Sequence, residues 1–315
     1  MIALEEITAA RERIAGAVLR TPLVRLQVPE APAEIYLKLE NLQPIGSFKL
    51  RGALNAVKQI PRGELADGVV TASAGNMGQG VAWAARELGV PCTVVVPDSA
   101  AETKVAAIER LGGKVVKVPY DEWWEAIATS STPAAEGRFV HPVEDEAVMA
   151  GNGTIGIEIL EDLPDPDAVL VPFGGGGLSV GIAGAVRALA PTVSVFAVEP
   201  EPAAALTASL AAGEPREVAG TPSFVDGSGS PRVLPKMWPL ACEALAGAFA
   251  VPVDDVAAAV RLLVNRARIV AEGAGALALA AALASRGGNG KVVCVVSGGN
   301  IDEAKLRTIL SGETP

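Results

Sequence analysis

Short runs of apolar, β-branched residues alternate along most of the chain with longer segments whose apolar residues recur at helical spacing. The runs predict seven strands, at residues 35–40, 68–73, 92–97, 114–119, 168–173, 193–199 and 291–297. Segments of helical spacing lie between them, for example at 76–89, 102–112 and 178–190. Strands that are apolar on both faces and joined by helices are typical of a parallel sheet covered on both sides. The pattern therefore predicts a doubly wound α/β architecture.

Composition narrows the class of function. The chain has 315 residues, 50% of them hydrophobic, and a formal net charge of −10. At about 100 to 200 residues per domain, this length predicts two domains or one large one. A chain with this apolar content can bury enough surface to fold. Its excess of acidic residues argues against binding to nucleic acids or anionic membranes. Residues 1–14 lack the apolar core of a signal peptide, and no run approaches the ~20 apolar residues of a membrane span. We therefore expect a soluble, cytoplasmic protein that acts on small molecules.

The cysteine and histidine content excludes several kinds of site. Cys92, Cys242 and Cys294 are far apart and odd in number, which favours buried, reduced thiols over a disulfide framework or a zinc cluster. His141 is the only histidine. Any mechanism that needs two histidines is therefore excluded, and a Ser-His-Asp triad would depend on this one residue.

Ligands of open α/β sheets bind beyond the carboxyl ends of the strands, and four such turns are unusual here. The first, at 40–53, places Lys49 between apolar neighbours, which can lower the pKa of its amine and make it a nucleophile able to form a Schiff base. A surface lysine at the start of a helix is the alternative. The second turn, FGGGGL at 173–178, follows a strand and opens a helix, so its backbone N–H groups can converge on a phosphate. It matches neither a nucleotide P-loop nor the dinucleotide fingerprint.

The other two turns offer further hydrogen-bond donors. At 71–80, the segment TASAGN precedes a predicted helix, where exposed amides either bind a carboxylate or form an ordinary helix cap. At 295–300, Ser297 ends a strand and is followed by two glycines that permit a close approach, with a capping serine as the alternative. A further segment, GNGTIG at 151–156, matches the GxGxxG spacing. No strand precedes it and a helical pattern follows it, so we do not interpret it as a dinucleotide site.

Taken together, these segments resemble the fold-type II pyridoxal-phosphate enzymes, specifically the serine/threonine dehydratase and serine racemase group. The resemblance covers nearly the whole chain, through KLENLQPIGSFKLRGA, SAGNMGQG, HPVEDE with GNGTIGIEI, FGGGGL, AVEP and VVSGGN in that order. It implies an α/β fold like that of tryptophan synthase β, with two domains that each hold a largely parallel sheet flanked by helices. A large cofactor-binding domain would comprise residues 1–51 and 143–315. A small domain, residues 52–142, would carry the substrate-carboxylate loop.

The resemblance also implies roles for individual residues. Lys49 would hold pyridoxal 5'-phosphate through a Schiff base, and its freed amine would then remove the Cα proton of the substrate. Asn76 would hydrogen-bond the ring hydroxyl of the cofactor, and Ser297 would meet its pyridine nitrogen. A hydroxyl there, unlike a carboxylate, would not force ring protonation, which favours prompt β-elimination. The phosphate would bind the main-chain N–H groups of Gly174, Gly175, Gly176 and Gly177. The substrate carboxylate site would be lined by Ser73, Ala74, Gly75, Asn76 and Met77.

The implied reaction is the dehydration and deamination of L-threonine or L-serine to a 2-oxo acid and ammonia, carried out by a homodimer. The chain departs from the family pattern at several positions. Ile45 stands where relatives usually have threonine, and Met77 replaces the histidine of SAGNH. Both departures favour a substrate with an apolar β-substituent, hence threonine over serine. Ala205 stands where the racemase-like branch offers, after Glu199, a carboxylate to a divalent cation. We therefore expect no metal site.

Other activities remain open. Within the family, the alternatives are a serine racemase, a threonine synthase and a β-replacement synthase, although GSFKLRGA is closer to the dehydratase pattern than to the synthases. Ala74 occupies the place of a serine that returns a proton to Cα in the racemase-like branch, which favours elimination. Outside enzymes, a non-catalytic α/β ligand-binding protein would explain the glycine turns but not the lysine. Purified enzyme should be yellow, whereas a binding protein should not.

Overall fold

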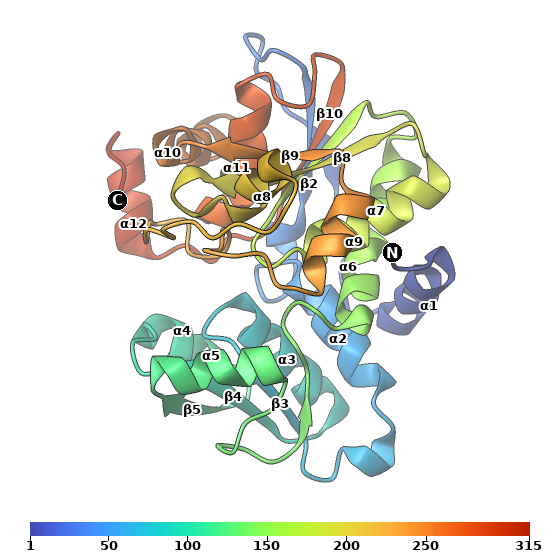
Figure 1. Ribbon diagram of the computed structural model, residues 1–315. Helices are drawn as coiled ribbons and strands as arrows, with labels where there is room; N and C mark the ends of the chain where they lie inside the picture. Colours follow the sequence, from blue (N-terminus) through green and yellow to red (C-terminus); the bar gives the residue numbers. More distant parts are fainter.

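The computed structural model describes all residues from 1 to 315 and contains two separate β-sheets, one above the other in Figure 1. The larger sheet has the strand order β1-β2-β10-β7-β8-β9 and the smaller one the order β5-β4-β3-β6. The larger sheet consists of β1 (Leu23–Arg25), β2 (Glu34–Leu39), β10 (Lys291–Val296), β7 (Ala168–Pro172), β8 (Ser194–Pro200) and β9 (Gly247–Val251). The smaller sheet consists of β5 (Lys114–Val118), β4 (Cys92–Pro97), β3 (Val69–Ala72) and β6 (Arg138–Phe139).

Each of the seven predicted strands forms, and all neighbouring strands pair in parallel except β1 and β2, which are antiparallel. Three strands were not predicted. β1 and β6 contain only 3 and 2 residues, too few to produce a pattern, and β9 is half-buried along most of its length. The predicted α/β class with parallel sheets is confirmed.

Twelve α-helices cover the sheets. They are α1 (Leu4–Ile14), α2 (Lys49–Gln59), α3 (Asn76–Leu88), α4 (Glu102–Arg110), α5 (Tyr120–Thr129), α6 (Glu146–Asp162), α7 (Gly177–Leu189), α8 (Ala205–Ala212), α9 (Met237–Ala244), α10 (Val253–Leu262), α11 (Gly273–Leu283) and α12 (Glu303–Leu310). Shorter helical turns are η1 (Glu40–Leu42), η2 (Arg62–Glu64), η3 (Glu201–Ala203) and η4 (Leu263–Ala267). None of these helices combines the length and the apolar character that a membrane span requires.

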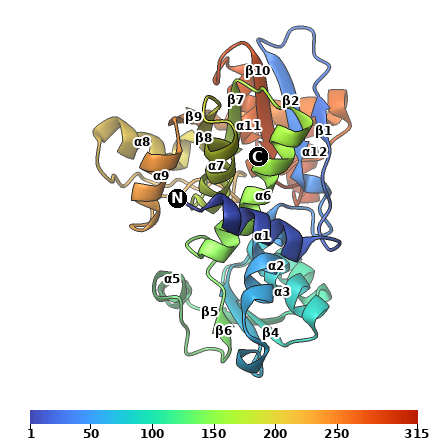
Figure 2. The same ribbon diagram turned by 90° about the vertical axis from the view of Figure 1, so that its right-hand side faces the viewer.

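Both faces of each sheet are buried under helices. In the larger sheet, one face packs against α10 and α11 and the other against α6 and α7. In the smaller sheet, one face packs against α2, α3 and α4 and the other against α5. Helix α2 lies between α3 and α6 and so joins the two units, while α1 crosses α6 on the outside (Figure 2). This burial on both faces explains why the strands are apolar throughout.

The GNGTIG segment is a helix-packing surface within α6. A Cβ atom on Gly151 would lie 2.5 Å from the carbonyl oxygen of Arg51, and one on Gly153 would lie 2.8 Å from that of Gly181. A Cβ atom on Gly156 would lie 2.9 Å from the carbonyl oxygen of Ile182. The three glycines therefore let α6 approach the backbones of α2 and α7, and the segment lies inside a helix as its sequence context indicated.

The three cysteines are free thiols, but only two occupy the predicted environment. Cys92 on β4 and Cys294 on β10 are buried, and burial raises the pKa of the Cys92 thiol to about 12. The expectation of a buried thiol is wrong for Cys242, which is exposed on α9. Met237 and Ala241 form the core-facing side of this short helix, and the position after Ala241 turns toward solvent.

Candidate active site

Lys49 is the first residue of α2 and follows a turn that is hydrogen-bonded to the segment at the end of β10. The N–H of Phe48 donates to the carbonyl oxygen of Ser297 at 3.0 Å, and the N–H of Gly299 donates to that of Gly46 at 2.9 Å. Ser47 and Gly298 also form an antiparallel bridge. These contacts bring the predicted residues Lys49 and Ser297 together, although they lie on turns almost 250 positions apart in the chain.

The environment of the Lys49 amine disfavours its charged form. Its Nζ donates to the carbonyl oxygen of Pro142 at 3.2 Å and lies 5.2 Å from the centroid of the Phe48 ring. Burial lowers the pKa of Lys49 to about 8, and the negative charge of Glu272 partly opposes that shift. A useful fraction of the amine is therefore unprotonated near neutral pH, as a nucleophile or base requires.

The glycine turn before α7 is tightly packed at Gly175 and Gly176 and in ordinary contact at Gly174. Gly176 has a φ of +99°, and a Cβ atom there would lie 2.8 Å from the Phe173 ring. A Cβ atom on Gly175 would lie 2.4 Å from the Val143 side chain. At Gly174 the nearest atom outside the turn would be 3.5 Å away, in a neighbouring segment at 227–229. This turn therefore accommodates no larger residue at 175 or 176, and it opens α7 with unpaired N–H groups, the arrangement that binds a phosphate.

The start of α3 is the second candidate binding turn. Gly75 is the N-cap, its N–H donates to Ser73 Oγ at 3.3 Å, and a Cβ atom on Gly75 would meet open space. Asn76 begins the helix, whereas the Met77 side chain is only 2% exposed and packs in the core. Ile45 is buried in the same core. Both side chains therefore pack in the core at the edge of this turn, and the preference for an apolar substituent stays a prediction.

Three polar residues near Asn76 and Lys49 were not identified from the sequence: Glu272, Asn300 and Ser47. Asn76 Nδ2 donates to Glu272 Oε1 at 2.8 Å, and Asn300 Nδ2 donates to Asn76 Oδ1 at 2.8 Å. The Oγ of Ser47 is buried without a hydrogen-bond partner. The sequence does contain an indication of Glu272, because it is the only charged residue between Arg268 and Arg286, within an otherwise apolar run.

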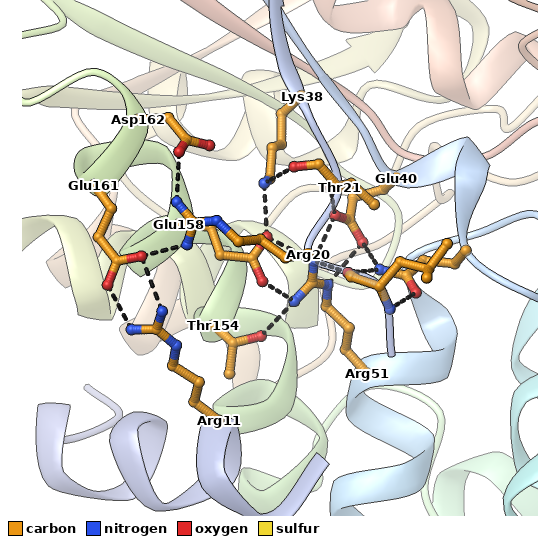
Figure 3. A network of polar contacts seen from close by, with 12 residues as sticks. Arg11, Arg20, Thr21, Lys38, Glu40, Arg51, Thr154, Glu158, Glu161 and Asp162 are labelled. Carbon is orange, nitrogen blue, oxygen red and sulfur yellow. Dashed lines mark hydrogen bonds and ion pairs between the residues drawn. The ribbon is translucent and has the colours of Figure 1, made fainter. Parts of the chain in front are cut away.

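A buried cluster of charges holds the first turn of α2 (Figure 3). Arg51 lies between two carboxylates, with Nε 2.8 Å from Glu40 Oε2 and Nη1 2.7 Å from Glu158 Oε1. Lys38 Nζ lies 2.6 Å from Glu158 Oε2. All four side chains are buried, and their two positive and two negative charges balance. The cluster joins β2, η1, α2 and α6, and thereby holds the helix that begins with Lys49.

These residues fit the pyridoxal phosphate that the sequence resemblance implies. The partly buried lysine has a depressed pKa, the glycine turn offers N–H groups to a phosphate, and Ser47 has a buried hydroxyl without a partner. A model of the family described as pyridoxal-phosphate dependent enzyme matches residues 14–298 of the chain. The chain belongs to this family.

Relatives within the family include lyases and a racemase. The chain is 41% identical to an L-threonine ammonia-lyase of Thermotoga maritima, over 99% of this chain and 79% of that protein. It is 38% identical to the catabolic L-threonine dehydratase TdcB of Escherichia coli K12, over 98% of this chain and 96% of that protein. The crystal structure of serine racemase from Dictyostelium discoideum superposes with a TM-score of 0.87 and 34% identity, over 96% of this chain and 99% of that one.

We predict that activity survives exhaustive chelation with EDTA. No group of three or more histidine, cysteine, aspartate or glutamate side chains lies close enough together to hold a metal ion. The Glu199 carboxylate accepts hydrogen bonds from the N–H of Leu206 at 3.0 Å and from the N–H and Oγ1 of Thr207 at 2.8 Å each. It is therefore already satisfied by α8. Loss of turnover in EDTA that Mg²⁺ or Ca²⁺ restores would contradict this prediction.

Proposed function

We propose that this chain is a lyase that dehydrates and deaminates L-threonine, L-serine or both to a 2-oxo acid and ammonia. The observation that carries the proposal is the environment of the Lys49 amine. This amine is partly buried, its pKa is lowered to about 8, and backbone hydrogen bonds hold the preceding turn against the end of β10. The relatives named L-threonine ammonia-lyase and L-threonine dehydratase support this choice of reaction. The substrate would lose its Cα proton and its β-hydroxyl as water. The enamine product would then take up water and release ammonia.

In this proposal the chain binds and orients the reactants around Lys49. Bound pyridoxal phosphate supplies the electron sink that makes the Cα proton removable. Lys49 Nζ attaches the cofactor and later accepts the Cα proton, for which a pKa near the working pH is suited. The N–H groups of residues 174–177 bind the phosphate, and those of residues 73–77 bind the substrate carboxylate. Asn76 hydrogen-bonds the ring hydroxyl, and Ser297 meets the ring nitrogen without imposing a charge on it.

The proposal predicts which amino acids are consumed. A panel of L-amino acids incubated with the cofactor-loaded protein should give 2-oxobutanoate from L-threonine, pyruvate from L-serine, or both, with one equivalent of ammonia in each case. Amino acids without a β-leaving group, such as L-alanine, serve as the control and should give no 2-oxo acid. A protein that is yellow but releases 2-oxo acid from no member of the panel would contradict the lyase assignment.

Racemisation is the second candidate, because the serine racemase fold superposes over almost the whole chain. A racemase needs an acid opposite Lys49 to return a proton to Cα, and Ala74 at the start of the α3 turn has no exchangeable proton. We therefore predict that L-serine gives pyruvate with little D-serine. Chiral chromatography after partial turnover measures both products. D-serine that accumulates faster than pyruvate would show that another group or water supplies the missing acid.

We further propose a cytoplasmic homodimer in which residues 1–51 and 143–315 form the cofactor-binding domain and residues 52–142 the small domain. The separation of the two sheets supports this division, and the three free cysteines suit a reducing compartment. Light scattering during size-exclusion chromatography would measure twice the 32.0 kDa chain mass for a dimer. A species of single-chain mass at micromolar concentration would exclude the dimer.

A further inference from the structure

Glu272 is a buried carboxylate that the proposed reaction does not use. It stands at the N-cap of α11, is 7% exposed, and its N–H donates to the carbonyl oxygen of Gly298 at 3.0 Å. The Glu272 side chain packs against Gly298 and leaves no room there for a larger residue, because a Cβ atom on Gly298 would lie 2.4 Å from Glu272 Oε1. A carboxylate in such a place is costly unless it is hydrogen-bonded and faces positive charge. The surroundings of Glu272 therefore indicate a specific use.

The hydrogen bonds of Glu272 fix the orientation of Asn76. One N–H of the Asn76 amide donates to Glu272 Oε1 at 2.8 Å, and its Oδ1 accepts from Asn300 Nδ2 at 2.8 Å. Asn300 Nδ2 also donates to the carbonyl oxygen of Ile45 at 2.8 Å, which ties the arrangement to the turn before Lys49. A flipped Asn76 amide would place its oxygen against the carboxylate and its nitrogen against a donor. One N–H of Asn76 therefore remains free in a fixed direction.

We propose that Glu272 is a positioning residue of this site, which holds the free N–H of Asn76 toward an oxygen acceptor on the bound cofactor and whose charge stabilises the ammonium form of Lys49. This inference deepens the proposed function and rests on it for the identity of the cofactor. Its two parts separate in experiment, because glutamine at 272 keeps an acceptor for Asn76 but carries no charge, whereas alanine removes both.

The charges around Glu272 come from four parts of the chain. Lys49 on α2 and Lys104 on α4 favour the ionised carboxylate, and Asp226 in the loop after α8 disfavours it. Asp226 is itself paired with Lys104 at 2.8 Å and with Lys305 on α12 at 3.3 Å. Burial is the largest effect and raises the pKa of Glu272 to about 7. Glu272 is therefore ionised above about pH 7, where it opposes deprotonation of Lys49.

The sign of the effect on Lys49 follows from these charges. Burial lowers the pKa of Lys49 to about 8, and the Glu272 charge limits that fall. Replacement of Glu272 by glutamine removes the charge, so the pKa of Lys49 should fall further and more free amine should be present at neutral pH. Because the pKa of Glu272 is itself about 7, its charge acts fully only above that pH, and an interaction of about one unit would move the midpoint of Lys49 deprotonation by about half a pH unit.

The test measures the reactivity of Lys49 in the full-length chain freed of pyridoxal phosphate, so it does not depend on lyase turnover. Limited acetylation with acetic anhydride between pH 6 and 10, followed by mass spectrometry of the Lys49 peptide, gives the labelling rate at each pH. We expect Glu272→Gln to shift the midpoint of the profile to lower pH by about half a pH unit. Glu272 and Glu303 both line a cleft between α4 and α12, and Glu303 is an exposed acid, so Glu303→Gln is the matched control. Its profile should overlay that of the wild type.

The dissociation constant of pyridoxal phosphate tests the other part of the proposal, the positioning of Asn76. Glu272→Gln should retain affinity within about twofold, and Glu272→Ala should weaken it about fivefold, the effect of one lost hydrogen bond. Wild-type and variant proteins are first compared by circular dichroism, so that only folded variants are scored. A Glu272→Gln labelling profile identical to the wild type, or equal affinities of the glutamine and alanine variants, would overturn the inference. A shifted profile in a protein that releases no 2-oxo acid would instead contradict the proposed function alone.

Discussion

Replacement of Lys49 by alanine is expected to reduce lyase turnover by about 10⁴-fold or more. The variant loses the amine that attaches the cofactor and also the group that accepts the Cα proton, and general base catalysis alone accounts for about 10² to 10⁴-fold. Burial of the residue makes its pKa, about 8, suited to both tasks. Steady-state formation of 2-oxobutanoate from L-threonine measures the effect.

The control for this variant lies on the same helix. Lys58 near the end of α2 is exposed and donates to the carbonyl oxygen of Arg13 at 2.7 Å. Lys58→Ala should keep turnover within about twofold, since surface substitutions of this kind are mild. Equal turnover in Lys49→Ala and Lys58→Ala would show that Lys49 is not the essential amine.

Replacement of Arg51 by methionine is expected to lower the free energy of unfolding by about 3 to 5 kcal/mol at pH 7, the usual cost of breaking a buried ion pair from one side. The variant leaves Glu40 and Glu158 buried with only Lys38 to balance them. Urea unfolding followed by circular dichroism measures the change. The control is Arg11→Met, which removes a partner of Glu161 on the exposed side of the same helix α6 and should cost less than about 1 kcal/mol. Similar losses in the two variants would contradict the role of the buried cluster.

The same cluster predicts how stability depends on pH. Glu40 is fully buried, which by itself raises the pKa of its carboxyl, but the charge and hydrogen bonds of Arg51 outweigh burial and hold that pKa below its usual value. A carboxyl with a depressed pKa stabilises the fold above its unfolded pKa, and this contribution is lost as pH falls through the folded pKa. Without Arg51, burial raises the pKa of Glu40. The difference in stability between wild type and Arg51→Met should therefore shrink as the pH is lowered below about 5.

The strands and the binding turns could be predicted from the sequence because both are local properties. Each strand is apolar on two faces, and each turn carries a residue type whose chemistry is visible without its neighbours: a lysine between apolar residues, four glycines, or a small polar segment before a helix. Contacts between distant positions are not visible in this way. Arg51 meets Glu158 across 107 positions, and Asn76 meets Glu272 across 196. These two pairs depend on how α2 packs against α6 and on where the starts of α3 and α11 meet.

The direction of single side chains is harder to predict than the strands. Ile45 and Met77 depart from the family pattern, which suggested a role in substrate choice, and both side chains pack in the core beside the smaller sheet. The expectation of a buried thiol is wrong for Cys242, because this position lies one step beyond the core-facing Ala241 on α9 and turns the thiol to solvent. The direction in which one side chain of a helix points depends on which face of the helix packs against the core, and the local sequence does not determine that face.

The central claim is that Lys49 carries the cofactor, and the most direct test is to map the attachment site. The yellow protein is reduced with borohydride, dialysed and digested, and its peptides are examined by mass spectrometry for the mass of a reduced pyridoxyl phosphate group. The account predicts this mass on the peptide that contains Lys49, and its absence in Lys49→Ala. A label on any other lysine, or a protein that is never labelled, would contradict it.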